Sequence, residues 1–344
     1  MVIKGSFKML GSWAAVLFQP QSDSKHGKLL LLDWTRPQAT SKRTILLHPD
    51  KVVDCAFVDE SAVVVLHCSD ALSSPSGNIR YILRVYNLDN TKPGATLSFS
   101  LALPPLRSGL RITRSTLSTS PRLPLSCSGA RMDDVACPYE QHRVDKGLMT
   151  VQFRFGEQHD KRSSDLTIVI SLEHFSRFIQ LKALKHTHDA IPWAYWGPSM
   201  SRILVARLNN YACTSAFGDV SGYRMPFAEQ DVRDHSIELV HTRDSWLYKL
   251  GILDFNPESV SWAQKTLQDG RSLPAQGILV AGTTSVGPDE IFAESCDSSL
   301  PYYRAYIEGS HRVYSYDLTQ DRLVAKLSTP TEVKFALYGT AFIS

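Results

Sequence analysis

The sequence predicts an all-β protein built as a β-propeller of six or seven blades, one of which can be incomplete. About twenty short runs have the composition of strands, turn-forming residues separate them, and one local pattern recurs. In this pattern an apolar run closes on Asp or Asn beside an aromatic residue or leucine, at Asp33, Asn87, Asp254 and Asp317. These positions are 54, 167 and 63 residues apart, and 167 is about three steps of 55. A unit of roughly 40–50 residues is typical of a propeller blade, and such blades usually build a binding platform.

The composition is that of an ordinary globular protein, and we expect one domain over residues 1–344. Hydrophobic residues make up 43% of the chain and charged residues 21%, enough apolar material for a large core. The net charge is +3 and no block of five like charges occurs, so neither nucleic acid nor an anionic membrane is an expected partner. Six scattered cysteines without a C-x-x-C pair favour reduced thiols over a disulfide framework.

The first residues do not resemble a secretion signal. The apolar stretch 13–18 is shorter than a signal core, and Gln19-Pro20 stands where a cleavage site would have small residues. No run approaches the ~20 apolar residues that cross a bilayer. We therefore expect a soluble cytoplasmic or nuclear protein that is not secreted.

Two kinds of strand are expected. Met149, Val151, Phe153 and Phe155 alternate with polar residues, and residues 97–103 alternate in the same way, which is typical of strands with one buried face. Runs that are apolar throughout suit strands covered on both faces. These runs are 52–58, 62–67, 166–172, 203–208, 237–241 and 277–281.

One helix is expected over residues 257–269. Asn256 can cap it, Pro257 suits the first helical position, and Gly270 ends it. Its apolar face is expected to consist of Val260, Ala263 and Leu267.

The segment 104–147 differs from its surroundings. It is rich in proline and serine and shows little periodicity, which predicts a long loop or insertion within the domain. An alternative is a basic docking or phosphorylation segment, because serine and threonine lie beside arginines. These arginines are Arg107, Arg111, Arg114, Arg122 and Arg131.

Patterns that indicate enzyme chemistry are missing. There is no phosphate-binding loop or dinucleotide fingerprint, and the serine in 218–222 is one place too late for a nucleophile elbow. His186, His188 and Asp189 form the only metal-like cluster, but no third histidine follows within ten residues. The carboxylate pairs 133–134 and 231/234 fall in expected loops. We therefore assign no catalytic residue, no cofactor-binding residue and no metal ligand, and we expect no cofactor and no enzyme.

Two aromatic clusters are candidate binding anchors, because Trp and Tyr bury large areas and carry a polar atom. For the tryptophans, wedging between blades is the favoured interpretation. For the tyrosines, binding and packing stay open. The clusters are Trp193, Tyr195 and Trp196, and Tyr302, Tyr303 and Tyr306.

Four segments of the second half carry a resemblance. They are I-P-W-A-Y-W-G-P at 191–198 followed by S-R at 201–202, L-G-I-L-D-F-N-P at 250–257, E-I-F-A-E-S-C-D-S-S-L-P-Y at 290–302, and D-L-T-Q-D-R-L-V-A-K at 317–326. In this order they resemble the C-terminal region of F-box proteins of mushroom-forming fungi, over roughly residues 190–330. The resemblance implies a propeller-like recognition domain that holds targets for a Skp–cullin ubiquitin ligase.

The chain departs from that family in three respects. Glu294-Ser295 replaces a Glu-Asp pair, the last string is loosened, and residues 1–50 are predicted as strands where a helical F-box would lie. A Skp-type adaptor is therefore expected as a partner only if an F-box lies upstream.

The main hypothesis is a non-enzymatic protein-interaction module whose target, and whose protein-binding residues, the sequence does not identify. The alternatives are a propeller-fold hydrolase that uses paired carboxylates, and a stand-alone scaffold without a ligase link.

Overall fold

The computed structural model of the chain is dominated by antiparallel β-strands, which confirms the predicted all-β class. The structure describes residues 5–10, 13–18, 28–33, 42–46, 51–59, 61–69, 79–88, 96–110, 112–120, 147–156, 163–182, 189–209, 212–213, 215–230, 247–274, 277–288, 291–309, 313–318, 322–328 and 333–339.

The strands form five successive sheets, which we number I to V in chain order. Sheet I contains β1 (Gly5–Leu10), β2 (Trp13–Phe18), β3 (Lys28–Asp33) and β4 (Lys42–Leu46). Sheet II contains β5 (Lys51–Asp59), β6 (Ala62–Ser69), β7 (Arg80–Asn87) and β8 (Thr96–Ala102). Sheet III contains β9 (Ile112–Thr119), β10 (Leu148–Gly156), β11 (Ser163–Ser171), β12 (Ser201–Asn209) and β13 (Ala212–Cys213).

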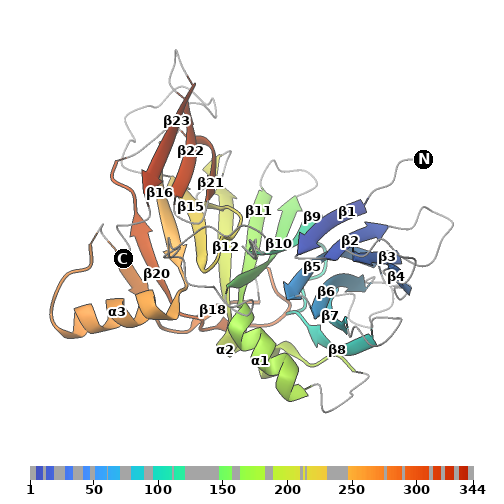
Figure 1. Cartoon of the computed structure of the whole chain (residues 1–344). Coiled ribbons are helices and arrows are strands. Elements are labelled where there is room, and N and C mark those ends of the chain that lie inside the picture. Colours follow the sequence, from blue (N-terminus) through green and yellow to red (C-terminus); the bar gives the residue numbers. More distant parts are fainter. Residues whose placement is uncertain are drawn as a thin grey trace, which may run out of the picture.

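Sheet IV contains, in spatial order, β14 (Ser215–Phe217), β15 (Arg224–Gln230), β16 (Tyr248–Asp254), β20 (Tyr302–Tyr306) and β17 (Ile278–Val280). A small hairpin of β18 (Thr284–Val286) and β19 (Cys296–Ser298) lies in the segment between β17 and β20. Sheet V contains β21 (Val313–Leu318), β22 (Arg322–Ser328) and β23 (Val333–Gly339). Figure 1 shows the sheets following one another across the molecule, from blue at the right to red at the left. Among the described strands no pairing joins sheet I to sheet V.

Consecutive sheets pack face to face, and each hydrophobic cluster of the described residues lies between two of them. Strand β6 shows the consequence for the sequence. Val63 and Val65 belong to the cluster between sheets I and II, whereas Val64 and Leu66 belong to the cluster between sheets II and III. A strand covered on both faces needs apolar side chains at every position, and this confirms the interpretation of the run 62–67.

The first strands of sheets I, II and III lie side by side. Lys8 of β1 donates from Nζ to the carbonyl oxygen of Leu117 in β9, at 3.2 Å. The amide of Leu117 donates to Asp54 Oδ2 of β5 at 2.9 Å, and Lys8 Nζ lies 3.9 Å from the same oxygen. Two side chains thus connect three sheets through the backbone of one residue.

The recurring Asp/Asn pattern marks equivalent places in three sheets. Asp33, Asn87 and Asp254 each end the third strand of their sheet, β3, β7 and β16, whereas Asp317 lies in β21, the first strand of sheet V. The described strands make five sheets of three or more strands and one two-stranded hairpin, and the number of blades stays a prediction. Sheet III alone lies between the sheets of Asn87 and Asp254, because long insertions between its strands lengthen it.

The predicted loop 104–147 is wrong in part, because β9 runs through it. Only Leu117 of this strand is fully buried, so the strand carries no apolar alternation that would predict it. Pairing with the edge of β10, together with the contact to Asp54, holds it in the sheet. Residues 121–146 of the same segment lie outside the described residues.

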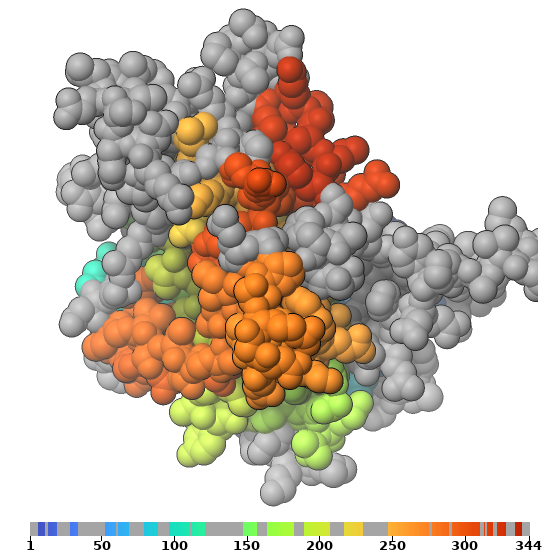
Figure 2. All heavy atoms as spheres, turned by 90° about the vertical axis from the view of Figure 1, so that its left-hand side faces the viewer, coloured from blue at the N-terminus to red at the C-terminus, as the bar shows by residue number. Residues whose placement is uncertain are grey.

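The predicted helix is present as α3 (Pro257–Gln268). Asn256 caps it by accepting a hydrogen bond from the amide of Glu258 at 3.1 Å, and Pro257 occupies the first turn. Val260 and Ala263 are buried as expected, but Leu267 is exposed, because Thr266 takes the next inward position. Figure 2 shows α3 in orange on the outer surface of the molecule.

Three helical segments were missed. Helix α1 (Leu172–Lys182) buries Leu172 and Phe175 and packs Ile179 against the cluster between sheets II and III, a helical spacing that the sequence does contain. The other two are a 3-10 turn (Trp193–Tyr195) and α2 (Gly197–Met200).

The predicted alternation of residues 97–103 is present in part, since Leu97 is exposed while Phe99, Leu101 and Leu103 are buried. The run 237–241 lies outside the described residues. In the part of the chain that the structure describes, no helix is both long and apolar enough to cross a bilayer.

Candidate functional site

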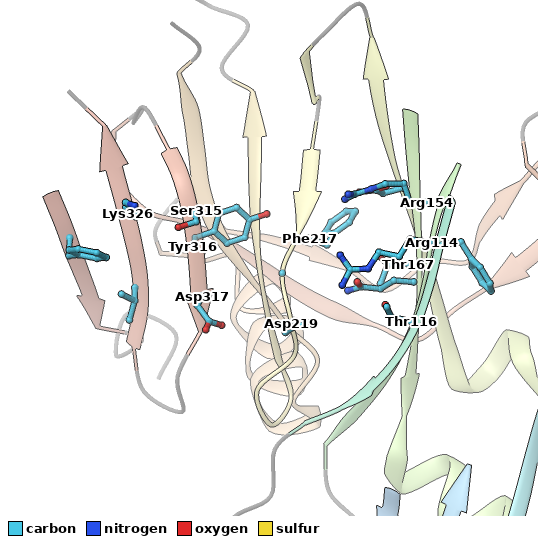
Figure 3. A pocket seen from close by; sticks show the side chains of 16 residues that line it. Arg114, Thr116, Arg154, Thr167, Phe217, Asp219, Ser315, Tyr316, Asp317 and Lys326 are labelled. Carbon is cyan, nitrogen blue, oxygen red and sulfur yellow. The ribbon is translucent and has the colours of Figure 1, made fainter. Parts of the chain in front are cut away.

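The first strands of sheets III, IV and V surround a groove of about 560 Å³. β9 lines one side, the end of β14 with Gly218 and Asp219 lies in the middle, and β21 lines the other side (Figure 3). A volume of this order is typical of ligand pockets in proteins. The groove is therefore the candidate functional site.

A row of charged residues crosses the wall that sheet III contributes. Arg114, Arg154 and Asp165 are direct cross-strand neighbours on β9, β10 and β11. Arg154 donates from Nε and Nη2 to the two carboxylate oxygens of Asp165, each at 2.8 Å. The side chain of Arg114 has no hydrogen bond or ion pair within the described part of the chain. Like charges directly opposite one another on a sheet are unfavourable, so Arg154 is compensated by Asp165 while Arg114 is left with its full charge.

A second row on the same wall is polar and uncharged. It consists of Thr116, Gln152 and Thr167, also cross-strand neighbours. Strand β10 explains the arrangement, because Val151 and Phe153 face the cluster with sheet II while Gln152 points the other way. The predicted alternation of this strand thus gives the groove its polar wall.

The middle and far sides add aromatic rings and acids. Phe217 lies at the end of β14, and Tyr316 projects from β21 toward it, as do Arg114 and Arg154 from sheet III (Figure 3). Gly218 permits this arrangement, because a Cβ there would lie 2.8 Å from Pro226 Cγ and 3.2 Å from Tyr316 Cε2.

Acids and a lysine complete the lining of the groove on the side away from sheet III. Asp219 is exposed, as is Asp317, whose Oδ1 accepts from the amide of Leu318 at 2.8 Å. Lys326 of β22 lies opposite Phe335 of β23, a side chain that is 71% exposed. On the side of sheet III the groove thus carries Arg114 and the Arg154–Asp165 pair. The middle and the side of β21 carry Asp219, Asp317 and Lys326, and aromatic rings lie between the two sides.

Three of the four conspicuous motifs lie outside the groove and hold the fold together, whereas the fourth, at 317–326, contributes Asp317 and Lys326 to it. In W-G-P, Gly197 allows the ring of Trp193 to lie against the backbone, since a Cβ would come within 2.2 Å of Trp193 Cδ2. The indole of Trp196 donates to the carbonyl oxygen of Ala102 at 3.1 Å. Both tryptophans are buried and stand edge to face at 4.9 Å, while Tyr195 is 78% exposed. The tryptophans therefore pack between elements of the fold, as predicted.

The S-R pair and the S-S-L-P-Y string are bound to each other. Arg202 is 1% exposed and donates from Nε to the carbonyl oxygen of Leu300 at 2.8 Å, and from its terminal nitrogens to Gly282 O and Thr284 Oγ1. The amide of Leu300 donates to Ser201 O at 2.9 Å. Burial lowers the pKa of Arg202, and the nearby Tyr302 opposes this effect. These residues attach the hairpin region 282–300 to β12.

The L-D-F-N-P string has a similar structural role. Asp254 is fully buried, receives Arg224 Nε at 3.1 Å, and accepts from the amide of Asn256 and the hydroxyl of Ser259. It therefore joins the end of β16 to the start of α3.

The tyrosine cluster lies on β20, where Tyr303 is buried and Tyr302 and Tyr306 are half-buried. Tyr303 is fully buried and donates to Pro274 O at 2.9 Å. Tyr306 donates to Glu229 Oε2 at 2.8 Å, and the same oxygen receives Arg304. Burial, assisted by the contact with Glu229, raises the pKa of Tyr306 to about 12. These tyrosines stabilise sheet IV.

The remaining sequence candidates are not brought together by the structure. His186, His188 and the carboxylate pairs 133–134 and 231/234 lie outside the described residues, and Asp189 is exposed. No group of three metal-ligating side chains occurs among the residues that the structure describes. The groove itself was not predicted, although Arg114 belonged to the basic docking alternative for 104–147, and Asp317 and Lys326 to the last string of the resemblance.

Comparison with known proteins adds no identification. Neither the models of protein families nor the curated proteins contain a match to this chain. The resemblance to fungal F-box proteins therefore stays a prediction from the sequence.

Proposed function

We propose that this chain is a non-enzymatic protein-binding module, with its sheets arranged as in a β-propeller. In this proposal it corresponds to the target-recognition part of an F-box protein. The propeller arrangement is supported by the order of the sheets, since each packs on the next and the clusters between them follow the chain. In propellers the sheets repeat radially around a central channel.

The positions of the first strands support the same arrangement. β1, β5 and β9 are joined through Lys8, Asp54 and Leu117, and β9, β14 and β21 line one groove. First strands that lie next to one another from sheet to sheet are expected of a radial assembly. They are not expected of a sandwich, in which only two sheets face each other.

The binding function is inferred from a difference in side-chain hydrogen bonding between the groove and the three motifs outside it. Two buried charged side chains of these motifs, Arg202 and Asp254, are hydrogen-bonded within the chain, although the buried Trp193 Nε1 has no partner among the described residues. In the groove, Arg114 and Asp219 have no such partner among the described residues, and both are exposed beside aromatic rings. Arginine and aromatic side chains that are not needed for the fold are typical of a recognition surface.

Capture of the partner followed by reconstitution tests the proposal. The tagged chain is cross-linked in cells that express it, the captured protein is identified, and the two purified proteins are mixed. We expect saturable binding with no change in the mass of the partner. Turnover of the partner, or the failure of every captured protein to bind once purified, would contradict the proposal.

The link to the ubiquitin ligase is tested separately with a purified Skp-type adaptor. Residues 1–50 contribute the strands β1 to β4 of sheet I, so we expect residues 1–344 to bind the target and not the adaptor. Adaptor binding by this chain would show that the ligase link uses a surface other than an F-box.

A further inference from the structure

We propose that the groove between sheets III, IV and V binds an extended segment of the partner protein that carries one acidic side chain next to an aromatic or aliphatic one. This inference rests on the proposed function and specifies the ligand of that function.

The acidic side chain is inferred from Arg114. The guanidinium of Arg154 is occupied by both oxygens of Asp165, whereas Arg114, directly opposite on the neighbouring strand, has no acceptor in the described part of the chain. A guanidinium presents a planar fork of donors that matches a carboxylate in two hydrogen bonds. A ligand carboxylate would also relieve the repulsion between the two arginines.

The apolar neighbour is inferred from the rings that the arginines face. Phe217 and Tyr316 both line the groove, Tyr316 projecting from β21 toward the side of Phe217, and Phe335 is mostly exposed at its far side. Because Gly218 has no side chain, the ring of Tyr316 can lie close to the backbone here. Aromatic side chains of this kind are the usual anchors of peptide recognition, because they bury a large area at a small cost in conformational entropy.

The extended form of the ligand is inferred from the backbone. β9, β14 and β21 are all edge strands of their sheets, but Lys8 and Asp54 already bond to the outer edge of β9 at Leu117. No described strand pairs with the outer edges of β14 and β21. A peptide in the groove can therefore add to an edge through main-chain hydrogen bonds, while its alternate side chains enter the groove.

The acids on the other side limit the number of negative charges that the ligand can carry. Asp219 and Asp317 line the groove across from the arginine wall. A strongly acidic segment would meet like charges there, which costs binding energy and gives specificity. The expected ligand thus has a single acid directed at Arg114 and neutral or basic residues toward Asp219 and Asp317.

A selection from random peptides tests the inference directly. The full chain is immobilised, a displayed library of random twelve-residue peptides is selected against it, and the enriched peptides are measured by fluorescence polarisation. We expect a consensus with one Asp or Glu beside an aromatic or aliphatic residue. Enrichment of peptides without an acid, or no enrichment at all, would overturn the inference.

Charge reversal identifies the contact. Arg114→Glu is expected to weaken the selected peptide at least tenfold, and replacing the acid of the peptide by lysine is expected to restore binding to this variant. Arg177→Glu on α1 changes the charge equally at an exposed position outside the groove and is expected to bind as the wild type does. If Arg114→Glu proves unstable by thermal melting, Arg114→Gln provides the same comparison with a smaller change. Wild-type affinity in the folded Arg114 variant would overturn the inference.

The inference and the proposed function can fail independently. If the captured partner protein binds equally to wild type and Arg114→Glu, the module binds a protein through another surface and the groove assignment is wrong. If neither a protein nor a peptide binds the wild type, the proposed function fails as well.

Discussion

Asp54 Oδ2 accepts a hydrogen bond from the amide of Leu117 at 2.9 Å, so a side chain of β5 satisfies the backbone edge of β9. This bond crosses from sheet II to sheet III, and its acceptor is 6% exposed. The remaining oxygen accepts from the amide of Cys55 at 2.8 Å. A carboxylate in this position fixes the spacing of two neighbouring sheets at the side where their first strands meet.

Asp54→Ala is expected to lower the free energy of unfolding by about 2 kcal/mol, because the amide of Leu117 is left without its acceptor. Asp54→Asn keeps one acceptor oxygen, so its free energy of unfolding is expected to fall less. Asp59→Ala, in the same strand but near solvent, removes a bond to Ser61 and serves as the control with a smaller loss. Equal losses from Asp54→Ala and Asp59→Ala in urea unfolding would refute a special role for the buried carboxylate.

Arg202→Met is expected to destabilise the protein by about 3 kcal/mol, since the carbonyl oxygens of Leu300 and Gly282 and the hydroxyl of Thr284 lose a charged donor. Arg202→Lys keeps the charge without the planar fork of donors, and its stability is expected to lie between those of the wild type and Arg202→Met. Arg271→Met, which removes an exposed pair with Asp269, is expected to change stability little. Chemical unfolding measures all three, and an Arg202→Met variant as stable as Arg271→Met would disprove the assigned role.

Gly197→Ala is expected to displace the ring of Trp193 and to cost roughly 1–3 kcal/mol, because the added Cβ would come within 2.2 Å of the indole. Thermal unfolding followed by tryptophan fluorescence detects both the loss of stability and the altered surroundings of the ring. Gly287→Ala meets nothing within 4 Å and is the matched control. Unchanged fluorescence in Gly197→Ala would show that the motif has another function.

Stability is expected to fall in alkaline solution. Burial, with a smaller effect of Asp54, raises the pKa of Cys55 from 9.0 to about 12. The folded state therefore favours the neutral thiol, and this contribution is fully present below about pH 9 and is lost as the pH rises toward 12. Urea unfolding at about pH 7.5, 9 and 10.5 measures the decline. Cys55→Ala is expected to be less stable at neutral pH, but its free energy of unfolding is expected to decline less steeply with pH. If the variant declined as steeply as the wild type, ionisation of Cys55 would not be the cause.

Much of the fold could be predicted because its determinants are local. The apolar run 62–67 reports a strand covered on both faces, and Asn256-Pro257 reports the start of α3. Strand β9 could not be predicted, since its stability comes from pairing with β10 and from Asp54, some sixty residues away in the sequence. Helix α1 was missed although Leu172, Phe175 and Ile179 follow a helical spacing, because the apolar strand before it masked the change of period.

The groove could not be predicted for a physical reason. Arg114 and Tyr316 become neighbours of the same space only through the register of sheet III and the packing of sheets IV and V. The motifs that stood out in the sequence mark residues with demanding internal contacts, such as Gly197 and Arg202. A motif can therefore identify what holds the fold together without identifying what the protein binds.

Hydrogen–deuterium exchange of the chain with and without its purified partner tests the central claim most directly. If the sheets form a docking platform around the groove, the partner will slow exchange in residues 112–119, 215–219 and 313–318 together, and leave α3 unchanged. Protection confined to α3 and β17, with none in these three segments, would contradict the account.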